Sequence, residues 1–340
     1  MKLSKRYITT FLAAVIIFSF LSFYKLPYYI YTPGKATDLK EVVKVDEGYE
    51  SNGSINLLTV SGRPATPVLY AIAKIKPHHD IVPLKEARPH GISDEDYLKS
   101  QLNLMENSQE ASLVVAYEAA NEDIEITYNG VYVLGTVKDM PAEKVLEVGD
   151  LITKIDNKKI NEANDLMTYI NENKQKEKVE ISFTRNNKEI TKTVGLAKFP
   201  EEDKKGIGIQ LVTNRDVKVD PKVKFSSGNI GGPSAGLMFA LSIYNQLKEE
   251  DLTKGLNITG SGQLDYEGNV LPIGGMDKKV IAAENKGMDI LFAPSYKSHN
   301  DSNYEEAKQT AKEIGSDMEI VPVENFEDAL DYLKTVAKTN

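Results

Sequence analysis

The sequence predicts a mixed α+β chain with an apolar helix at its N-terminus. An uncharged run rich in Phe, Leu, Ile and Ala covers residues 7–24. Toward the other end, strand-like runs at 289–293 and 318–323 are each followed by a segment with helical spacing of apolar residues. Between these parts, short apolar segments bounded by glycine are typical of strands, and residues 179–194 resemble a hairpin.

The N-terminal run is compatible with a membrane anchor. Basic residues within positions 1–6 precede it, Lys25 closes it, and its length is near the lower limit for spanning a bilayer. No small-x-small cleavage site follows, which favours an uncleaved anchor over a signal peptide. The sequence therefore predicts a cytoplasmic segment at 1–6, a transmembrane helix at 7–24, and an exported body from residue 25 onward, at the cell membrane.

Composition excludes several functional classes. After residue 25 the chain holds 37 basic and 50 acidic residues, so it has no electrostatic footprint for nucleic acid. It has no cysteine, and therefore no disulfide, thiol nucleophile or thiolate metal site. The adjacent His78 and His79 do not share a face on any regular element, which favours an exposed loop over a metal site. No Gly-Lys-Ser/Thr phosphate loop is present, so we expect no nucleotide, metal or other cofactor.

A glycine-dense loop at residues 228–236 is the strongest candidate for a catalytic site. It reads Gly-Asn-Ile-Gly-Gly-Pro-Ser-Ala-Gly and runs directly into an apolar segment of helical spacing. Ser234 would thus lie at a helix N-terminus, where unpaired amides and the helix dipole suit an oxyanion. Two alternatives are an ordinary N-cap serine and the Gly-x-Ser-x-Gly elbow of α/β-hydrolases. The elbow needs a downstream histidine, and only His299, in a polar stretch, follows.

A lysine is the best candidate for the base. None of the four histidines, His78, His79, His90 and His299, lies in an apolar or glycine-rich setting. After Gly274 and Gly275 a helix is expected in which Lys279 shares a face with small and apolar residues, whereas Lys278 points about 100° away. Burial would disfavour the charged form of such a lysine and make it basic near neutral pH. The alternative is that Lys279 is an ordinary solvated lysine on a helix and has no role as a base.

The two motifs in this order, Gly-Pro-Ser-Ala-Gly and Leu-Pro-Ile-Gly-Gly-x-x-x-Lys-x-x-Ala-Ala, resemble the proteolytic domain of Lon-type proteases. The resemblance implies a proteolytic domain at 206–340 with Ser234 as nucleophile and Lys279, not Lys278, as base. It also implies that Thr259 hydrogen-bonds the lysine and that the backbone around Gly232 and Pro233 contributes to the oxyanion site. Because Lon-type domains often form rings, a homo-oligomer is also compatible with it.

Residues 123–197 resemble a PDZ domain, especially in the Pro-Ala-Glu-Lys run at 141–144 and the Gly-Asp-Leu-Ile run at 149–152. PDZ domains bind an extended peptide by adding it to a sheet edge. The resemblance places that edge at Gly130, Val131, Tyr132 and Val133, with a helix starting at Ala163 as the other wall. A spacer or a domain that docks on its own protease is the alternative. We expect residues 25–122 to complete the protease fold.

Taken together, the chain resembles membrane-anchored Lon-like serine proteases that contain a PDZ domain and lack an ATP-hydrolysing domain. The resemblance implies an ATP-independent endopeptidase with a Ser-Lys dyad that cleaves exported or surface peptides and small or unfolded proteins, recruited by the PDZ domain. Two other classes stay open. One is a catalytically silent PDZ receptor, and the other is a hydrolase of another substrate, such as an ester.

Overall fold

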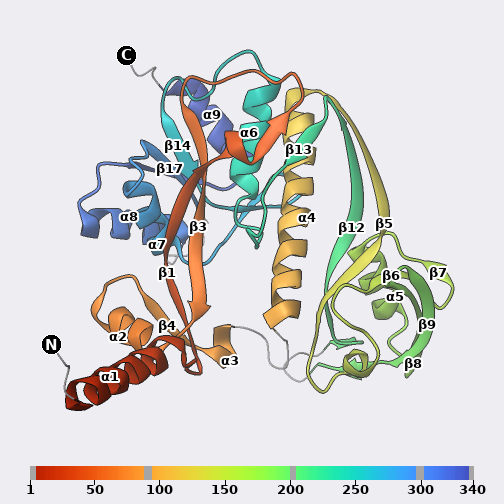
Figure 1. Ribbon diagram of the computed structural model, residues 1–340. Helices are drawn as coiled ribbons and strands as arrows, with labels where there is room; N and C mark the ends of the chain where they lie inside the picture. The colour runs from red at the N-terminus through yellow and green to blue at the C-terminus, as the bar shows by residue number, and fades with distance from the viewer. Residues whose placement is uncertain (1–4, 88–93, 200–203, 296–301, 337–340) are drawn as a thin grey trace.

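The computed structural model describes residues 5–87, 94–199, 204–295 and 302–336. It confirms a mixed α/β fold, in which two sheets lie on either side of the long helix α4, Asp94–Ala120 (Figure 1). The first sheet carries the helices α6 to α9, and the second sheet wraps around α5. Each sheet has its own hydrophobic core.

The first sheet joins strands from both ends of the chain. Its order is β18-β17-β14-β3-β1-β4, with β14 parallel to both β3 and β17. Residues 28–83 and 257–323 therefore build one sheet, although more than 170 residues separate them in sequence. The strands are β1 Tyr28–Asp38, β3 Ser54–Pro64, β4 Asp80–Pro83, β14 Asn257–Gly260, β17 Ile290–Pro294 and β18 Glu319–Val323.

Helices cover both faces of this sheet. The helix α6, Gly236–Leu247, is apolar on nearly all sides and is buried between the sheet, α4 and α9, Phe326–Thr335. On the other face, α7, Met276–Glu284, packs with α8, Asn303–Ile314, over a second apolar cluster. The start of α6 and the start of α7 thus meet at the same edge of the domain.

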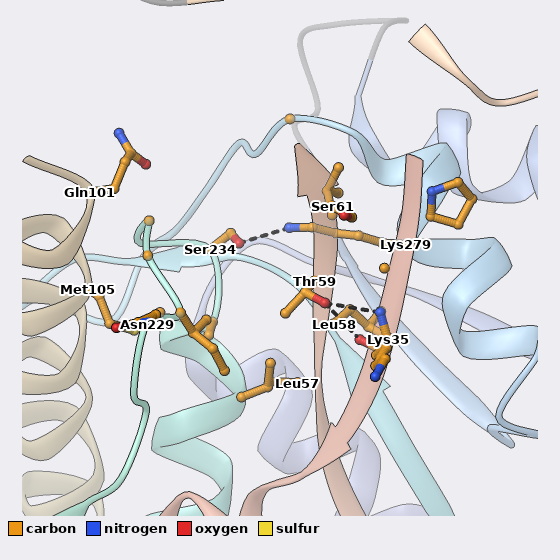
Figure 2. Close-up of a pocket in the computed structure, with 18 of the residues that line it drawn as sticks. Lys35, Leu57, Leu58, Thr59, Ser61, Gln101, Met105, Asn229, Ser234 and Lys279 are labelled. Atoms are coloured by element: carbon orange, nitrogen blue, oxygen red, sulfur yellow. Dashed lines mark hydrogen bonds between the residues drawn. The ribbon is translucent and has the colours of Figure 1, made fainter. Parts of the chain in front are cut away.

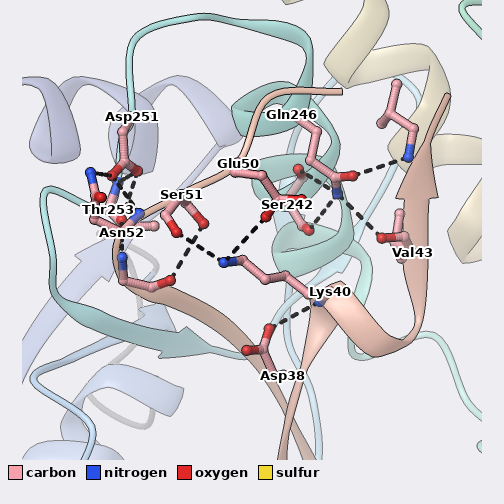
Figure 3. Close-up of polar contacts among 12 residues, drawn as sticks. Asp38, Lys40, Val43, Glu50, Ser51, Asn52, Ser242, Gln246, Asp251 and Thr253 are labelled. Carbon is pink, nitrogen blue, oxygen red and sulfur yellow. Dashed lines mark hydrogen bonds and ion pairs between the residues drawn. The ribbon is translucent and has the colours of Figure 1, made fainter. Parts of the chain in front are cut away.

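Residues 38–53 tie the N-terminal strands to α6 (Figure 3). The Gln246 side chain accepts a hydrogen bond from Val45 N at 3.0 Å and donates one to Val43 O at 3.3 Å. Asp251 accepts from Asn52 N at 2.9 Å. The short elements of this part of the structure are η1 Leu39–Glu41, β2 Val43–Val45, α3 Leu84–Ala87, β13 Val223–Phe225, β15 Gln263–Leu264 and β16 Val270–Leu271.

The second sheet has the order β12-β5-β6-β8-β9, with β7 paired to β6. It includes residues 209–220 because β12 pairs with β5 from end to end, so the sheet extends past residue 197, the boundary predicted from the sequence. The elements are β5 Asp123–Thr136, η2 Pro141–Lys144, β6 Leu151–Ile155, β7 Lys158–Lys159, α5 Ala163–Glu172, β8 Lys178–Arg185, β9 Lys188–Gly195, β10 Ala197–Lys198, β11 Lys205–Gly206 and β12 Ile209–Asp220.

The predicted peptide edge at Gly130, Val131, Tyr132 and Val133 is wrong. This part of β5 is paired on one side with β12, where Val131 faces Thr213, and on the other with β6, where Val131 faces Ile152. A strand that is hydrogen-bonded on both sides cannot accept a further strand. The strand of this sheet that lies beside α5 at an outer position is β12, which was predicted to belong to the other domain.

At the N-terminus, α1, Lys5–Phe23, packs against α2, Pro67–Ile75. Across the described parts of the chain, no helix combines the length and the apolarity that crossing a membrane requires. The transmembrane helix at residues 7–24 stays a prediction.

Candidate active site

The two predicted catalytic residues meet at the start of two helices (Figure 2). Ser234 lies two residues before α6, after a turn in which Gly232 has a φ of 89° that favours glycine. Lys279 lies in the first turns of α7, which begins after the left-handed Gly275. The Lys279 Nζ donates a hydrogen bond to Ser234 Oγ at 2.8 Å. The structure thus brings together two residues that are 45 positions apart.

The environment of Lys279 favours its neutral form. Its side chain is only 3% exposed. Burial lowers the pKa of Lys279 to about 7, against a small opposing effect of the Glu306 carboxylate. A lysine with that pKa is deprotonated in a large fraction of molecules at neutral pH and can take the proton of a serine hydroxyl.

Lys278 has the opposite environment, which explains why only one of the two neighbouring lysines can act as a base. Its Nζ lies 2.5 Å from Asp80 Oδ2 and 3.1 Å from Asp277 Oδ1. This buried lysine is therefore ion-paired with two carboxylates, whereas Lys279 is hydrogen-bonded to two hydroxyls. The helical period places Lys278 and Lys279 on different sides of α7, as predicted.

Ser261 is a site residue that was not predicted from the sequence. Its Oγ lies 2.7 Å from Lys279 Nζ and donates to Ser234 O at 2.9 Å, so it contacts both members of the pair. Thr259, to which this role is assigned from sequence, instead donates to Asn56 O at 2.9 Å across the sheet. Thr259 is still within β14, where the neighbouring β3 backbone is in reach, whereas Ser261 follows the strand end. The only sequence feature that could have pointed to Ser261 is that it supplies a second hydroxyl in the Thr-Gly-Ser-Gly stretch at 259–262.

The catalytic loop is held by α4. The Gly232 N–H donates to Gln101 O at 2.8 Å, and Pro233 O accepts from Ser108 Oγ at 3.0 Å. The predicted oxyanion role of the Gly232 amide is therefore not available in this structure, and Pro233 has no N–H to offer. Within the described residues, no acceptor is hydrogen-bonded to the Ser234 N–H. This amide, at the positive end of α6, is the donor best placed for an oxyanion.

A cleft of about 670 Å³ opens at Ser234 and Lys279. Its volume is within the range of small-molecule and peptide side-chain sites. Neither Asp nor Glu is among the described residues that line it. Its walls come from β1, β3, α4 and the catalytic loop: Thr32, Pro33, Gly34, Lys35, Leu57, Leu58, Thr59, Val60, Ser61, Arg63, Gln101, Met105, residues 229–235, Gly274 and Lys279 (Figure 2).

The Ser261→Ala variant is expected to reduce kcat for peptide hydrolysis by about tenfold, because Lys279 loses one of its two hydroxyl partners and samples other rotamers. The midpoint of the pH–rate profile should also move, since a hydrogen bond to the lysine is removed. Thr259→Val is the matched control. It loses the bond to Asn56 and should lower the unfolding temperature without moving that midpoint. If both variants had wild-type profiles, Ser261 would not position the lysine.

A buried lysine hydrogen-bonded to a serine at a helix start defines a class: serine hydrolases that use lysine as the base. Comparison with known families narrows this. Residues 203–335 match the Lon protease (S16) C-terminal proteolytic domain, and residues 99–196 match a PDZ domain. The chain thus carries a PDZ domain followed by a Lon-type proteolytic domain, which is a serine peptidase domain.

The relatives found are distant. The Lon protease of Aster yellows witches'-broom phytoplasma is 32% identical over 105 residues, which are 31% of this chain and 12% of that protein. The Lon protease of Campylobacter jejuni is 31% identical over 131 residues, or 35% of this chain and 16% of that protein. The match thus spans less than a fifth of each relative.

Among solved structures, the chain is similar to the PDZ domain of an SdrC-like protein from Listeria monocytogenes. That match has 35% identity and a TM-score of 0.25, and covers 26% of this chain and 93% of the other. A counterpart from Listeria innocua has 34% identity and a TM-score of 0.23, with coverages of 24% and 92%.

Proposed function

We propose that this protein is an ATP-independent serine endopeptidase that cleaves peptides and small or unfolded proteins through Ser234 and Lys279. The observation that carries the proposal is the 2.8 Å hydrogen bond from a buried lysine of lowered pKa to the serine. The match of the surrounding domain to the Lon proteolytic domain supports a peptide as the substrate, rather than an ester or a non-peptide amide.

The reaction follows from this geometry. Neutral Lys279 takes the proton of Ser234 as Oγ attacks the peptide carbonyl, and the Ser234 N–H faces the developing oxyanion. When the tetrahedral species collapses, protonated Lys279 gives its proton to the leaving amine and an acyl-enzyme remains. A water molecule then attacks the ester, again with Lys279 as base, and releases the acid and the free serine. Ser261 holds the Lys279 Nζ in position throughout.

The PDZ domain is proposed to recruit substrate at the groove between α5 and β12. This groove has a volume of about 400 Å³ and is lined mainly by apolar side chains. Its walls include Met167 and Ile170 on α5 and Ile209 and Leu211 on β12. Because β12 is the outermost strand on this side of the described sheet, an extended peptide could add to it by main-chain hydrogen bonds.

The cellular location is also a proposal. The apolar N-terminal run, its basic flank and the absence of a cleavage site in the sequence support an anchor in the cell membrane with the protease domain outside the cytoplasm. Several large apolar residues described in α1 are exposed, among them Phe11 at 69% and Phe18 at 68%, which is unusual for a helix in water.

One cell experiment tests these proposals together. Mass spectrometry would compare the peptides released by cells that produce wild-type protein, Ser234→Ala or Met167→Glu at equal levels. We expect specific cut ends to vanish in Ser234→Ala and to fall several-fold in Met167→Glu, which places a carboxylate in the apolar groove. Ile314→Glu, an apolar-to-acid change at the end of α8, is the control and should leave the cut ends unchanged.

Each outcome assigns a function. Identical peptide lists for wild type and Ser234→Ala would favour a silent PDZ receptor, and an unchanged Met167→Glu list would exclude recruitment through the groove. Fractionation of the same cells into membranes and soluble material would test the proposed location.

A further inference from the structure

The helix α2 is apolar on two sides, but only one side is packed. Ala73, Leu69 and Tyr70 contact a small core that includes Ile30 and Ala65. Val68, Ile72 and Ile75 recur at intervals of four and three residues, so they form a second stripe on the other side. These three side chains are 36%, 41% and 83% exposed. A helix that is apolar all round is normally covered on all sides, by protein or by lipid.

The helix α1 packs against α2 at the same corner of the molecule, and it also carries exposed apolar side chains (Figure 1). Two contacts fix the position of α2. Just before the helix, Ala65 O accepts a hydrogen bond from Leu26 N at 2.8 Å, and within the helix the Tyr70 ring lies 5.2 Å from the Tyr28 ring. The exposed apolar residues described in α1 include Phe11, Val15, Ile16, Ile17, Phe18, Phe20 and Phe23. Together the two helices present an apolar surface without a cover in the described structure.

The charged residues just after α1 and at the end of α2 are basic. The whole chain has more acidic than basic residues, 50 against 41. The exposed Lys25 nevertheless follows α1 closely, and the first acidic residue after α2, Asp80 on β4, is ion-paired with Lys278. Lys74 and Lys76 are exposed at the end of α2, where the Lys74 Nζ lies 5.5 Å from the centre of the Tyr70 ring. An apolar helix face with a basic border is the pattern of helices that lie at the surface of anionic membranes.

We propose that α2 docks on an anionic lipid surface, with Val68, Ile72 and Ile75 at the boundary between headgroups and acyl chains and with Lys74 and Lys76 at the headgroups. This surface is separate from α1 and does not require α1 to cross the bilayer. Because β1 and β3 run from α2 to the catalytic cleft, docking would hold the cleft at a set height above the membrane. Substrate segments close to the bilayer would then be the ones presented to Ser234.

The chain contains no tryptophan, so a single introduced one reports its own surroundings. The full-length Ile75→Trp variant would be mixed with vesicles of phosphatidylcholine and phosphatidylglycerol in which the acyl chains carry bromine. We expect its emission to shift to the blue and to fall by about half or more, because bromine quenches only at the depth of the acyl chains. Ile314→Trp, an exposed position on α8, is the control and should show neither change.

Further variants separate the possible occupants. Adding Lys74→Gln and Lys76→Gln to Ile75→Trp should weaken the quenching at low ionic strength, and the difference should shrink as ionic strength rises, because salt screens the attraction that these lysines supply. Unchanged emission of Ile75→Trp with vesicles, or equal quenching of Ile314→Trp, would overturn the proposal.

A blue shift without vesicles that grows with protein concentration would assign the stripe to a second copy instead. None of these readouts depends on proteolysis, so the proposal can fail while the proposed peptidase activity stands, and the reverse.

Discussion

Lys279→Arg is expected to reduce kcat for peptide cleavage by roughly 10³-fold or more, because arginine stays protonated and cannot take the proton of Ser234. Arginine keeps hydrogen-bond donors in the position of the lysine but cannot give up its proton, so the loss would report the missing base rather than a missing donor. Initial rates on an unfolded protein or a peptide mixture would measure it. Lys286→Arg, an exposed lysine just beyond the same helix, is the control and should have wild-type rates.

The pH dependence of the wild-type enzyme should also show that a neutral Lys279 is required. The pKa of Lys279 is lowered to about 7, and the neutral form is the active one. The rate should therefore rise about tenfold per pH unit below that pKa and level off above it. Wild-type rates in Lys279→Arg, or a rate independent of pH between about 5.5 and 8.5, would show that another group is the base.

Lys279→Met is expected to inactivate the protein and yet stabilise its proteolytic domain at neutral pH. In the unfolded chain the lysine keeps its proton up to its ordinary pKa of 10.5, whereas in the folded protein it loses the proton near pH 7. That difference disfavours folding by about 4 kcal/mol at pH 7. Methionine has no such cost, although it gives up the bonds to Ser234 and Ser261, about 1 kcal/mol each. The net gain should be about 2 kcal/mol.

The sign of this effect can be checked across pH. Between pH 7 and 10.5 the unfolded wild-type chain binds more protons than the folded protein, so wild-type stability rises with pH in this window. The stabilisation of Lys279→Met should therefore be largest at or below pH 7 and should vanish, or change sign, toward pH 10.5. Urea unfolding at several pH values would measure it. A difference that does not change with pH would mean that Lys279 is not buried as a neutral amine.

The sequence by itself points to the proposed catalytic pair, because both residues follow glycine-rich turns that start a helix. The unpaired amides at such a start mark Ser234, and the 3.6-residue period separates Lys279 from the ion-paired Lys278. These local patterns nominate both residues, and the resemblance to Lon-type proteases favours them over an N-cap serine and a solvated lysine. Local pattern also predicts the mixed fold, since apolar spacing distinguishes the strands at 289–293 and 318–323 from the helices that follow them.

Only the tertiary structure decides what surrounds the pair. Ser261 rather than Thr259 contacts the lysine because the β3 backbone, about 200 residues earlier, takes the threonine hydroxyl. The Gly232 amide is engaged by Gln101 from α4, and the predicted edge on β5 is not free because β12 pairs along the whole of β5. Each of these outcomes depends on a hydrogen bond between segments far apart in the chain. Secondary-structure propensity and hydrophobic periodicity describe only residues that are close in sequence. They therefore cannot predict which backbone group of a distant segment will accept a given hydrogen bond.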